Sequence, residues 1–381
     1  MGKHIKSVNP QLPWLVLPSS NSSCHQITMF DVFQSKIYNF DLPGPLRGGC
    51  CYGSSKGWLV IAKESFDDHK GTSVEEDLHD NIKHQLFLFN PISKVHIELP
   101  PISTIPCFNK SLEVPPHPSS KFTFTIKKIV LSSECASTFT VAALCGAELA
   151  ICQPNDKKWT ISTDFHCIDV LFSSDGGILN VLYDTRDDDK DVPFDIKDVE
   201  VNPDFNMKLR SKGITIRIVP DLTRGDEVKY YALWSAHLVN FNKELLYVRK
   251  EYNMLATEED ISKYYFQTRR FEVFKSKHNG RDSYTLELMG SLGDHAMFLQ
   301  PNGDCFSISG KILSGFNKNC IYFLDGMDYD DYEEDYHPNI SLESGVFHLG
   351  DGRIRRIFPA TKFPSQHSWF TPFLDLNDTS K

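Results

Sequence analysis

The first residue of this sequence whose spacing could do chemistry is a serine between two glycines. Residues 53–57 read Gly-Ser-Ser-Lys-Gly, which matches the Gly-x-Ser-x-Gly pattern with Ser55 at its centre. In α/β-hydrolases this pattern forms a sharp turn from a strand into a helix and exposes a nucleophilic serine. Here the second glycine leads into an apolar β-type run at 58–62, so we expect a turn between two strands. We therefore interpret the motif as structural, with no base to activate Ser55.

Histidine, cysteine and aspartate show no metal-binding pattern. The 14 histidines form no His-Glu-x-x-His motif, and the 10 cysteines form no Cys-x-x-Cys pair. The acidic runs at 187–189 and 330–331 lack the alternating spacing that wraps oxygens around a calcium ion. The sequence therefore predicts no catalytic residue, no metal and no cofactor, and the cysteines are expected to be reduced and partly buried thiols.

An unusual segment interleaves aromatic and acidic side chains. Residues 328–336 read Asp-Tyr-Asp-Asp-Tyr-Glu-Glu-Asp-Tyr, so that Tyr329, Tyr332 and Tyr336 are separated by carboxylates. Aromatic residues on such a loop can anchor a protein interface, while the acids steer a basic partner toward it. The alternative is a mobile loop without a function. These three tyrosines are the residues that we predict to bind a partner.

The overall charge argues against nucleic acid as the main partner. The chain has 40 Lys plus Arg and 50 Asp plus Glu, a formal net charge of −10 at pH 7, which repels phosphate backbones. The longest apolar run, 139–152, contains Glu148 and is too short to span a membrane as a helix. The apolar patch at 14–17 lies between prolines and does not resemble a signal peptide. We expect a protein of the cytoplasm or the nucleus, or both.

Elements that could hold such residues in place are almost all strands. Aromatic residues make up 12% of the chain, and Gly and Pro are frequent throughout, which together favour short strands over long helices. Only residues 256–265 look helical. The predicted strands are 36–40, 58–62, 85–89, 95–99, 128–132, 138–144, 149–152, 168–172, 178–183, 214–219, 236–239, 245–249, 271–275, 284–289, 296–299, 305–308, 320–324, 345–349 and 354–358.

An internal repeat organises these strands. Ser-Lys-Ile-Tyr at 35–38 returns as Ser-Lys-Val-His at 93–96, a period of about 60 residues that suits a unit of four strands. Repeats of this kind are typical of β-propeller blades, so we predict an all-β propeller of about six, or alternatively seven, four-stranded blades. A strand at 14–17 would complete the last blade. The polar stretches 64–84, 184–204 and 326–339 are interpreted as loops.

Several of these runs, taken in order, resemble landmarks of the plant DUF295 family, also described as the KIB1-4 type β-propeller. They extend over nearly the whole chain. The landmarks are Gly-Ser-Ser-Lys-Gly-Trp-Leu-Val at 53–60, Leu-Phe-Asn-Pro at 88–91 with Ile-Glu-Leu-Pro at 97–100, Ser-Leu-Gly-Asp-His-Ala-Met-Phe-Leu at 291–299, Asn-Cys-Ile-Tyr-Phe at 319–323, Gly-Val-Phe at 345–347 and Trp-Phe-Thr-Pro at 369–372.

The resemblance implies a propeller behind an N-terminal F-box, which docks a Skp1-like adaptor so that the propeller selects substrates of a ubiquitin ligase. Only 13 residues precede Trp14 here, without a helical pattern, so an F-box is not expected and neither is binding to a Skp1-like adaptor. We predict a tail at 1–13, a propeller domain at 14–374 and a tail at 375–381.

The predicted function is therefore non-catalytic binding of an unidentified protein, as in the substrate-recognition domain of F-box proteins. Two alternatives remain open. One is a propeller enzyme of the glycosidase or lactonase type, which would need carboxylates or metal ligands from several blades. The other is an organellar or non-functional family member without an F-box.

Overall fold

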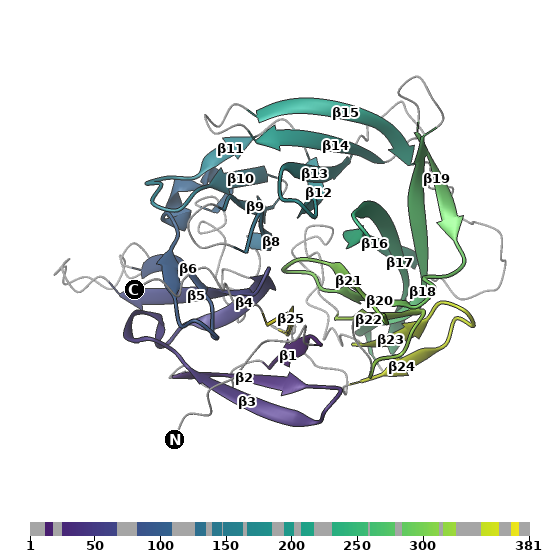
Figure 1. Cartoon of the computed structure of the whole chain (residues 1–381), viewed down its shortest axis with the longest axis horizontal. Coiled ribbons are helices and arrows are strands. Elements are labelled where there is room, and N and C mark those ends of the chain that lie inside the picture. Colours follow the sequence, from purple (N-terminus) through teal and green to yellow (C-terminus); the bar gives the residue numbers. More distant parts are fainter. Residues whose placement is uncertain are drawn as a thin grey trace. The chain divides into compact units, whose positions relative to one another are not determined.

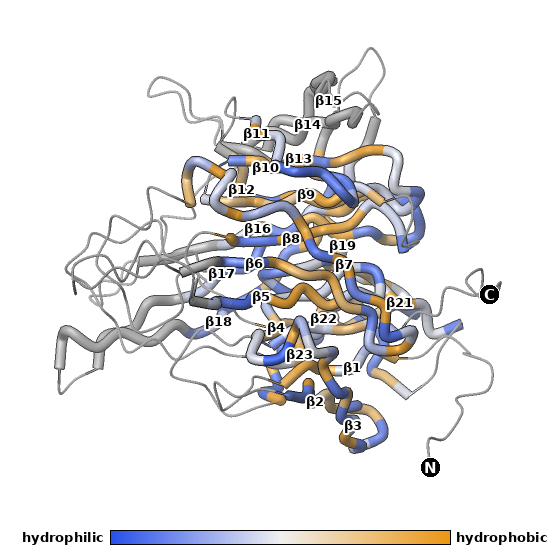
Figure 2. Tube along the Cα trace, turned by 90° about the vertical axis from the view of Figure 1, so that its left-hand side faces the viewer, coloured by the Kyte–Doolittle hydropathy of each residue, from blue (hydrophilic) through white to orange (hydrophobic). Residues whose placement is uncertain are grey.

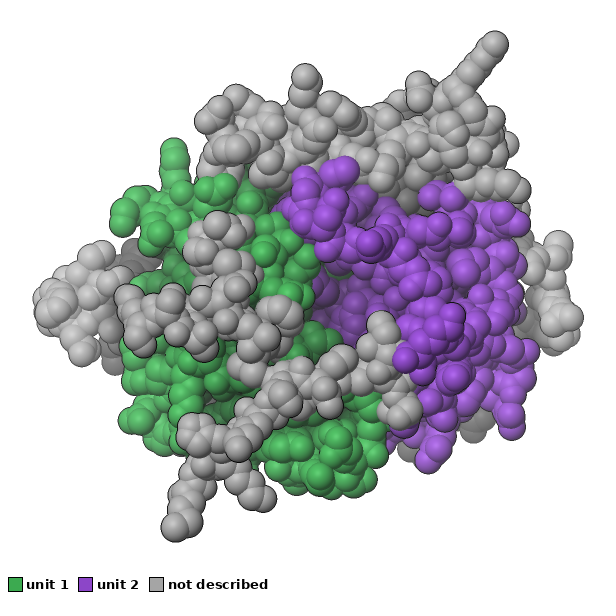
Figure 3. All heavy atoms as spheres, in the orientation of Figure 1, with its two compact units in different colours: residues 1–145, 150–161, 366–381 green, residues 146–149, 162–365 purple. Residues whose placement is uncertain are grey.

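The computed structural model describes residues 12–17, 25–66, 82–108, 126–134, 139–146, 148–162, 166–184, 194–201, 207–216, 231–257, 260–278, 284–311, 315–324, 344–357 and 367–372. In this part of the chain the strands form five sheets (Figure 1). The chain divides into two compact units, coloured separately in Figure 3. Unit 1 comprises residues 1–145, 150–161 and 366–381, and unit 2 comprises 146–149 and 162–365.

Unit 1 is built on three four-stranded sheets, and the first of them joins the two ends of the chain. Its order is β25-β1-β2-β3, with β1 antiparallel to both β2 and β25. The strands of the sheets of unit 1 are β1 (Trp14–Val16), β2 (Gln26–Asp31), β3 (Lys36–Asp41), β4 (Cys50–Ser55), β5 (Trp58–Phe66), β6 (Ile82–Phe89), β7 (His96–Glu98), β8 (Ile126–Leu131), β9 (Val141–Cys145), β10 (Glu148–Cys152), β11 (Thr160–Ser162) and β25 (Ser368–Phe370). The first two residues of β10 and the last of β11 are counted in unit 2.

Unit 2 holds one four-stranded sheet, β12 to β15, and one of nine strands in the order β19-β18-β17-β16-β21-β20-β22-β23-β24. The strands are β12 (His166–Phe172), β13 (Ile178–Asp184), β14 (Phe194–Val201), β15 (Met207–Ile216), β16 (Tyr231–Phe241), β17 (Glu244–Thr257), β18 (Asp260–His278), β19 (Tyr284–Met289), β20 (His295–Leu299), β21 (Phe306–Ser309), β22 (Cys320–Phe323), β23 (Gly345–His348) and β24 (Ile354–Arg356).

The nine-stranded sheet is two strand groups joined at one point. β16 pairs with β21 only through Asn240 and Phe306, which separates β16–β19 from β20–β24. The described strands therefore form repeated groups of four or five, and the chain is an all-β propeller of mainly four-stranded blades, as predicted.

Tight turns follow from residues that tolerate a positive φ. Lys56 (φ 46°) and Gly57 (φ 79°) connect β4 to β5, while Asn242 (φ 49°) and Lys243 (φ 67°) connect β16 to β17. Two consecutive residues in this region define the hairpin turn whose twist matches that of the flanking strands. These hairpins fix which residues face each other along each sheet.

Each unit has its own apolar core between the faces of its sheets. In unit 1, one cluster includes Trp58, Leu88 and Phe139, and another includes Trp14, Phe89 and Phe370. In unit 2, the clusters form around Val248 and Phe323 and around Leu238 and Tyr247. Figure 2 shows apolar residues running along strands such as β5 and β9. Burial of these residues is the main stabilising contribution.

Two sequence predictions about elements are wrong. Residues 256–265, expected to be helical, belong to β17 and β18, where Ala256 pairs with Tyr264. Residues 184–204, expected to be a loop, contain β14, which pairs with both β13 and β15. In both places the pairing with neighbouring strands outweighs a local pattern that is weakly helical or polar. The strand expected at 14–17 is present as β1, but it lies in the first sheet with β2 and β3, and β25 from the other end of the chain completes that sheet.

Within the described residues there is no helix long and apolar enough to cross a membrane.

Candidate functional site

The Gly-Ser-Ser-Lys-Gly motif connects two strands, as predicted, but only Lys56 and Gly57 form the turn, because the first three motif residues belong to β4. Ser54 and Ser55 are the last residues of β4, and β5 begins at Trp58. No helix follows the serine, so Ser55 lacks the geometry that exposes the nucleophile of a hydrolase. The motif is therefore a β-hairpin.

Both serines connect neighbouring sheets of unit 1. Each is 2% exposed. The Ser55 hydroxyl accepts a hydrogen bond from the backbone N–H of Leu131 in β8, with 2.8 Å between nitrogen and oxygen. The Ser54 hydroxyl donates to the backbone carbonyl of Trp369 in β25, and Ser368 donates to Ser54 at 3.1 Å. The strands β25, β4 and β8, each the edge of its own sheet, are thus held side by side. We call them the inner strands of unit 1.

The turn after the serines is fixed to the same neighbouring sheet. Lys56 Nζ donates to the carbonyl of Ser132 at 2.9 Å, and the indole nitrogen of Trp58 donates to the carbonyl of Glu134 at 3.0 Å. The polar groups around this turn, those of residues 54, 55, 56 and 58, therefore bind the backbone of the next sheet or of β25. The serine hydroxyls, which the motif suggested as nucleophiles, instead hold neighbouring sheets in alignment.

We expect Ser55→Ala to lower the free energy of unfolding by about 1–3 kcal/mol, because the buried N–H of Leu131 would lose its acceptor. Chemical or thermal unfolding measures this change. A fluorophosphonate probe should leave the wild-type serine unlabelled. Labelling that disappears in Ser55→Ala would contradict the structural interpretation.

An equivalent connection in unit 2 is made by a carboxylate. Asp169 on β12 is 3% exposed. One of its oxygens accepts from the N–H of Leu238 on β16 at 2.6 Å, and the other accepts from the N–H of Val170 at 2.8 Å. Asn240 donates to the carbonyl of Phe172 at 2.8 Å. These side chains join β12 and β16, which we call the inner strands of unit 2. No motif in the sequence marked Asp169 or Asn240.

A cysteine and a histidine lie together on the paired strands β22 and β23. The thiol of Cys320 is 3.2 Å from Nδ1 of His348 and 3.1 Å from the carbonyl oxygen of Lys318. Burial, with a smaller contribution from the charge of Asp351, raises the pKa of Cys320 to about 11. A nucleophilic cysteine needs the opposite shift, so we interpret the pair as a structural contact.

The described cysteines, Cys320 included, are consistent with the prediction of reduced thiols. All eight in the described residues are free, and burial raises the pKa of both Cys51 and Cys167 to about 12. Among the residues that the structure describes, no group of three or more His, Cys, Asp or Glu could hold a metal ion.

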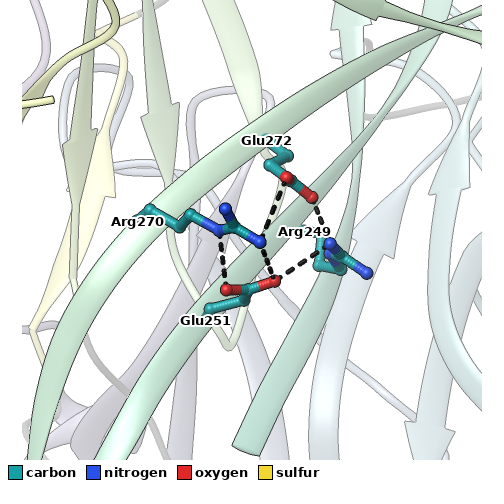
Figure 4. A network of polar contacts seen from close by, with 4 residues as sticks. All are labelled: Arg249, Glu251, Arg270 and Glu272. Atoms are coloured by element: carbon teal, nitrogen blue, oxygen red, sulfur yellow. Dashed lines mark hydrogen bonds and ion pairs between the residues drawn. The ribbon is translucent and has the colours of Figure 1, made fainter. Parts of the chain in front are cut away.

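Four charged side chains form a network across β17 and β18 (Figure 4). Glu251 is 2.9 Å from Arg249 and 2.7 Å from Arg270, while Glu272 contacts both arginines, with 3.5 Å to Arg270. Two positive and two negative charges alternate, so each compensates its neighbours. We interpret the network as a stabiliser of this long hairpin rather than as an anion-binding site.

The buried His367 predicts that the stability of unit 1 depends on pH. It precedes β25 and is buried, and burial lowers its pKa from 6.5. Below about pH 6.5 the unfolded chain therefore binds a proton that the folded chain does not, and stability falls as the pH falls until the folded pKa is passed. We expect His367→Gln to reduce the loss of melting temperature between pH 7.5 and pH 5. An equal loss in both proteins would contradict this.

The three tyrosines that we predicted to bind a partner, Tyr329, Tyr332 and Tyr336, lie outside the described residues, and their role stays a prediction.

Sequence reasoning missed the arginines at 353, 355 and 356, which are exposed at strand β24. Their signal was an Arg-Ile-Arg-Arg run within an acidic chain.

Comparisons with known proteins agree with this architecture. The KIB1-4 beta-propeller family model matches residues 29–348. No curated protein matches the chain in sequence. Solved structures with a similar course include the Cps50 (Swd1) β-propeller domain of Myceliophteria thermophila, at 11% identity and a TM-score of 0.31, covering 94% of this chain and 99% of that one.

Two further structures are enzymes by their descriptions. A PL25 ulvan lyase has 8% identity and a TM-score of 0.34, covering 97% of this chain and 98% of its own. The sialidase of Trypanosoma rangeli has 8% identity and a TM-score of 0.27, covering 73% and 54%. Likenesses this distant carry no functional argument, whereas the family model extends over most of the chain. The chain therefore belongs to the KIB1-4 beta-propeller family.

Proposed function

We propose that this chain is a non-catalytic propeller that recognises a partner protein. The observation that carries the proposal is that buried polar side chains on the inner strands bind the backbone of neighbouring sheets. Ser54, Ser55 and Asp169 are buried, and each binds the backbone of a neighbouring sheet. Propeller enzymes place reactive side chains where several blades meet, whereas these three side chains hold neighbouring sheets in register. Binding is then left to turns and outer strands, which is how rigid scaffolds present recognition residues.

The finer form of the proposal is selection of substrates for a ubiquitin ligase, in the cytoplasm or the nucleus. The resemblance of the chain to propellers that follow an F-box supports it. Direct binding of a Skp1-like adaptor is not part of the proposal. If adaptor and cullin subunits accompany the chain in cells, a further protein or segment would make that contact.

Affinity purification of the tagged chain from cells of its source organism tests the proposal. We expect a specific protein to be enriched over a purification with an unrelated propeller. Co-purifying adaptor and cullin subunits would support the ligase form, and their absence beside an enriched partner would leave only protein recognition. Purified protein that enriches no partner and hydrolyses glycosides or lactones would contradict the proposal.

A further inference from the structure

Strand β24 is the outer edge of the nine-stranded sheet. The sheet ends in the order β22-β23-β24, and within the described ranges no strand pairs with the other side of β24. β24 pairs with β23 through Gly345 with Arg356, Val346 with Arg355, and Phe347 with Ile354. An edge of this kind offers backbone groups to a further strand.

The hydrogen bonds of the ladder show which groups face outward. His348 N–H donates to the carbonyl of Arg353, and Ile357 N–H donates to the carbonyl of Ser344, both at the flanks of β24. In an antiparallel ladder, hydrogen-bonded pairs alternate with pairs that direct their N–H and C=O away from the partner. Arg353, Arg355 and Ile357 therefore bond to β23, and the backbone of Ile354 points to the outer edge.

The same edge carries concentrated positive charge. Arg353, Arg355 and Arg356 are exposed, and Asp351 is the only acidic residue in the described segment 344–357. The whole chain carries a net charge of −10, so this segment has the opposite sign to the molecule. The outer strands of unit 1 lack this concentration: β3 contains one lysine and one aspartate, β7 one glutamate, and β11 no charged residue.

The ion pair with Asp351 does not prevent Arg353 from binding a partner. The guanidinium of Arg353 lies 2.6 Å from Asp351, but 81% of the Arg353 side chain is exposed. Ion pairs at such exposure contribute little free energy and exchange readily with other partners. An incoming carboxylate can therefore share the guanidinium, which has further N–H donors.

We propose that β24 binds an extended acidic segment of a partner protein, which adds to the sheet as a further antiparallel or parallel strand. Ile354 supplies backbone hydrogen bonds, and Arg353 and Arg355 bind alternate carboxylates on the added segment. Strand addition gains affinity from the main chain and specificity from alternate side chains. The inference rests on the proposed protein-binding function, because it names the surface and the chemistry of the partner.

A fluorescent peptide of alternating glutamate and valine tests the proposal with the purified full chain. Fluorescence anisotropy should show binding that weakens as salt is added, because exposed charges are screened. The double variant Arg353→Glu/Arg355→Glu should weaken binding at least about tenfold. The matched control is Lys157→Glu/Lys158→Glu, which makes the same charge change at two exposed lysines beside β11 and should bind as wild type does.

A second peptide separates strand addition from charge alone. N-methylation of every second residue keeps the carboxylates but removes backbone donors, and we expect it to abolish binding. Equal binding of the methylated peptide, or equal loss in both double variants, would overturn the proposal. So would tighter binding of a single-stranded oligonucleotide at the same arginines.

The acidic residues 328–336 of this chain offer another occupant. If wild type does not bind the peptide but a variant with those six acids neutralised does, the edge is reserved for the chain's own segment and the proposal is wrong. The peptide assay requires no cellular partner. Its failure therefore leaves the broader protein-binding function to be judged by affinity purification.

Discussion

Trp369→Ala should lower the free energy of unfolding by about 3–5 kcal/mol, the range for truncating a large aromatic side chain in a core. Trp369 is 0% exposed and lies at the centre of β25. It pairs with Leu15 of β1, and its carbonyl accepts from Ser54 of β4. The substitution therefore leaves a cavity at the strand that joins the two ends of the chain.

Urea unfolding followed by far-ultraviolet circular dichroism measures this effect without relying on tryptophan fluorescence. The matched control is Ile37→Ala on β3, in the same sheet, where the side chain is 64% exposed. Its effect should stay within about 0.5 kcal/mol. If the two substitutions lower the free energy of unfolding equally, β25 is not an integral strand of unit 1.

Most strands of this fold were predictable because alternation and β-branched or aromatic residues mark them. The run at 85–89 lies within β6, and the run at 296–299 lies within β20. A strand before the turn at Ser55 was implied, but no range was predicted for β4, since Cys-Cys-Tyr-Gly-Ser-Ser has few residues that favour strands. Its pairing with β5 makes it a strand, and that pairing is a property of the assembled sheet rather than of the segment.

The site was less predictable than the fold because its contacts join distant parts of the sequence. The turn around Ser55 could be inferred from the apolar run that follows it. That Ser55 binds Leu131, 76 residues away, and that Ser54 binds Trp369, 315 residues away, could not. Hydrogen bonds between sheets depend on which strands become neighbours, and a single sequence gives no direct signal for that.

Asp169→Ala should destabilise unit 2 strongly. The carboxylate satisfies two backbone N–H groups, those of Leu238 and Val170, and both residues are 0% exposed. A buried donor left without an acceptor costs about 1–3 kcal/mol. Removal of both acceptors should therefore lower the free energy of unfolding by roughly twice as much as Ser55→Ala, which leaves only one N–H unsatisfied.

The conservative variant Asp169→Asn separates the contributions of the two hydrogen bonds. Asp169→Asn retains one carbonyl oxygen for one N–H, but its amide group has no acceptor capacity for the second, so its stability should lie between those of wild type and Asp169→Ala. Asp41→Ala removes an exposed carboxylate that binds Gln26 at 2.7 Å, and it should change stability by less than about 0.5 kcal/mol. Urea unfolding should thus rank Asp169→Ala below Asp169→Asn, with Asp41→Ala near wild type. If Asp169→Ala unfolds like wild type, the two inner strands of unit 2 are held together by apolar packing alone, and the same argument for the serines of unit 1 would weaken with it.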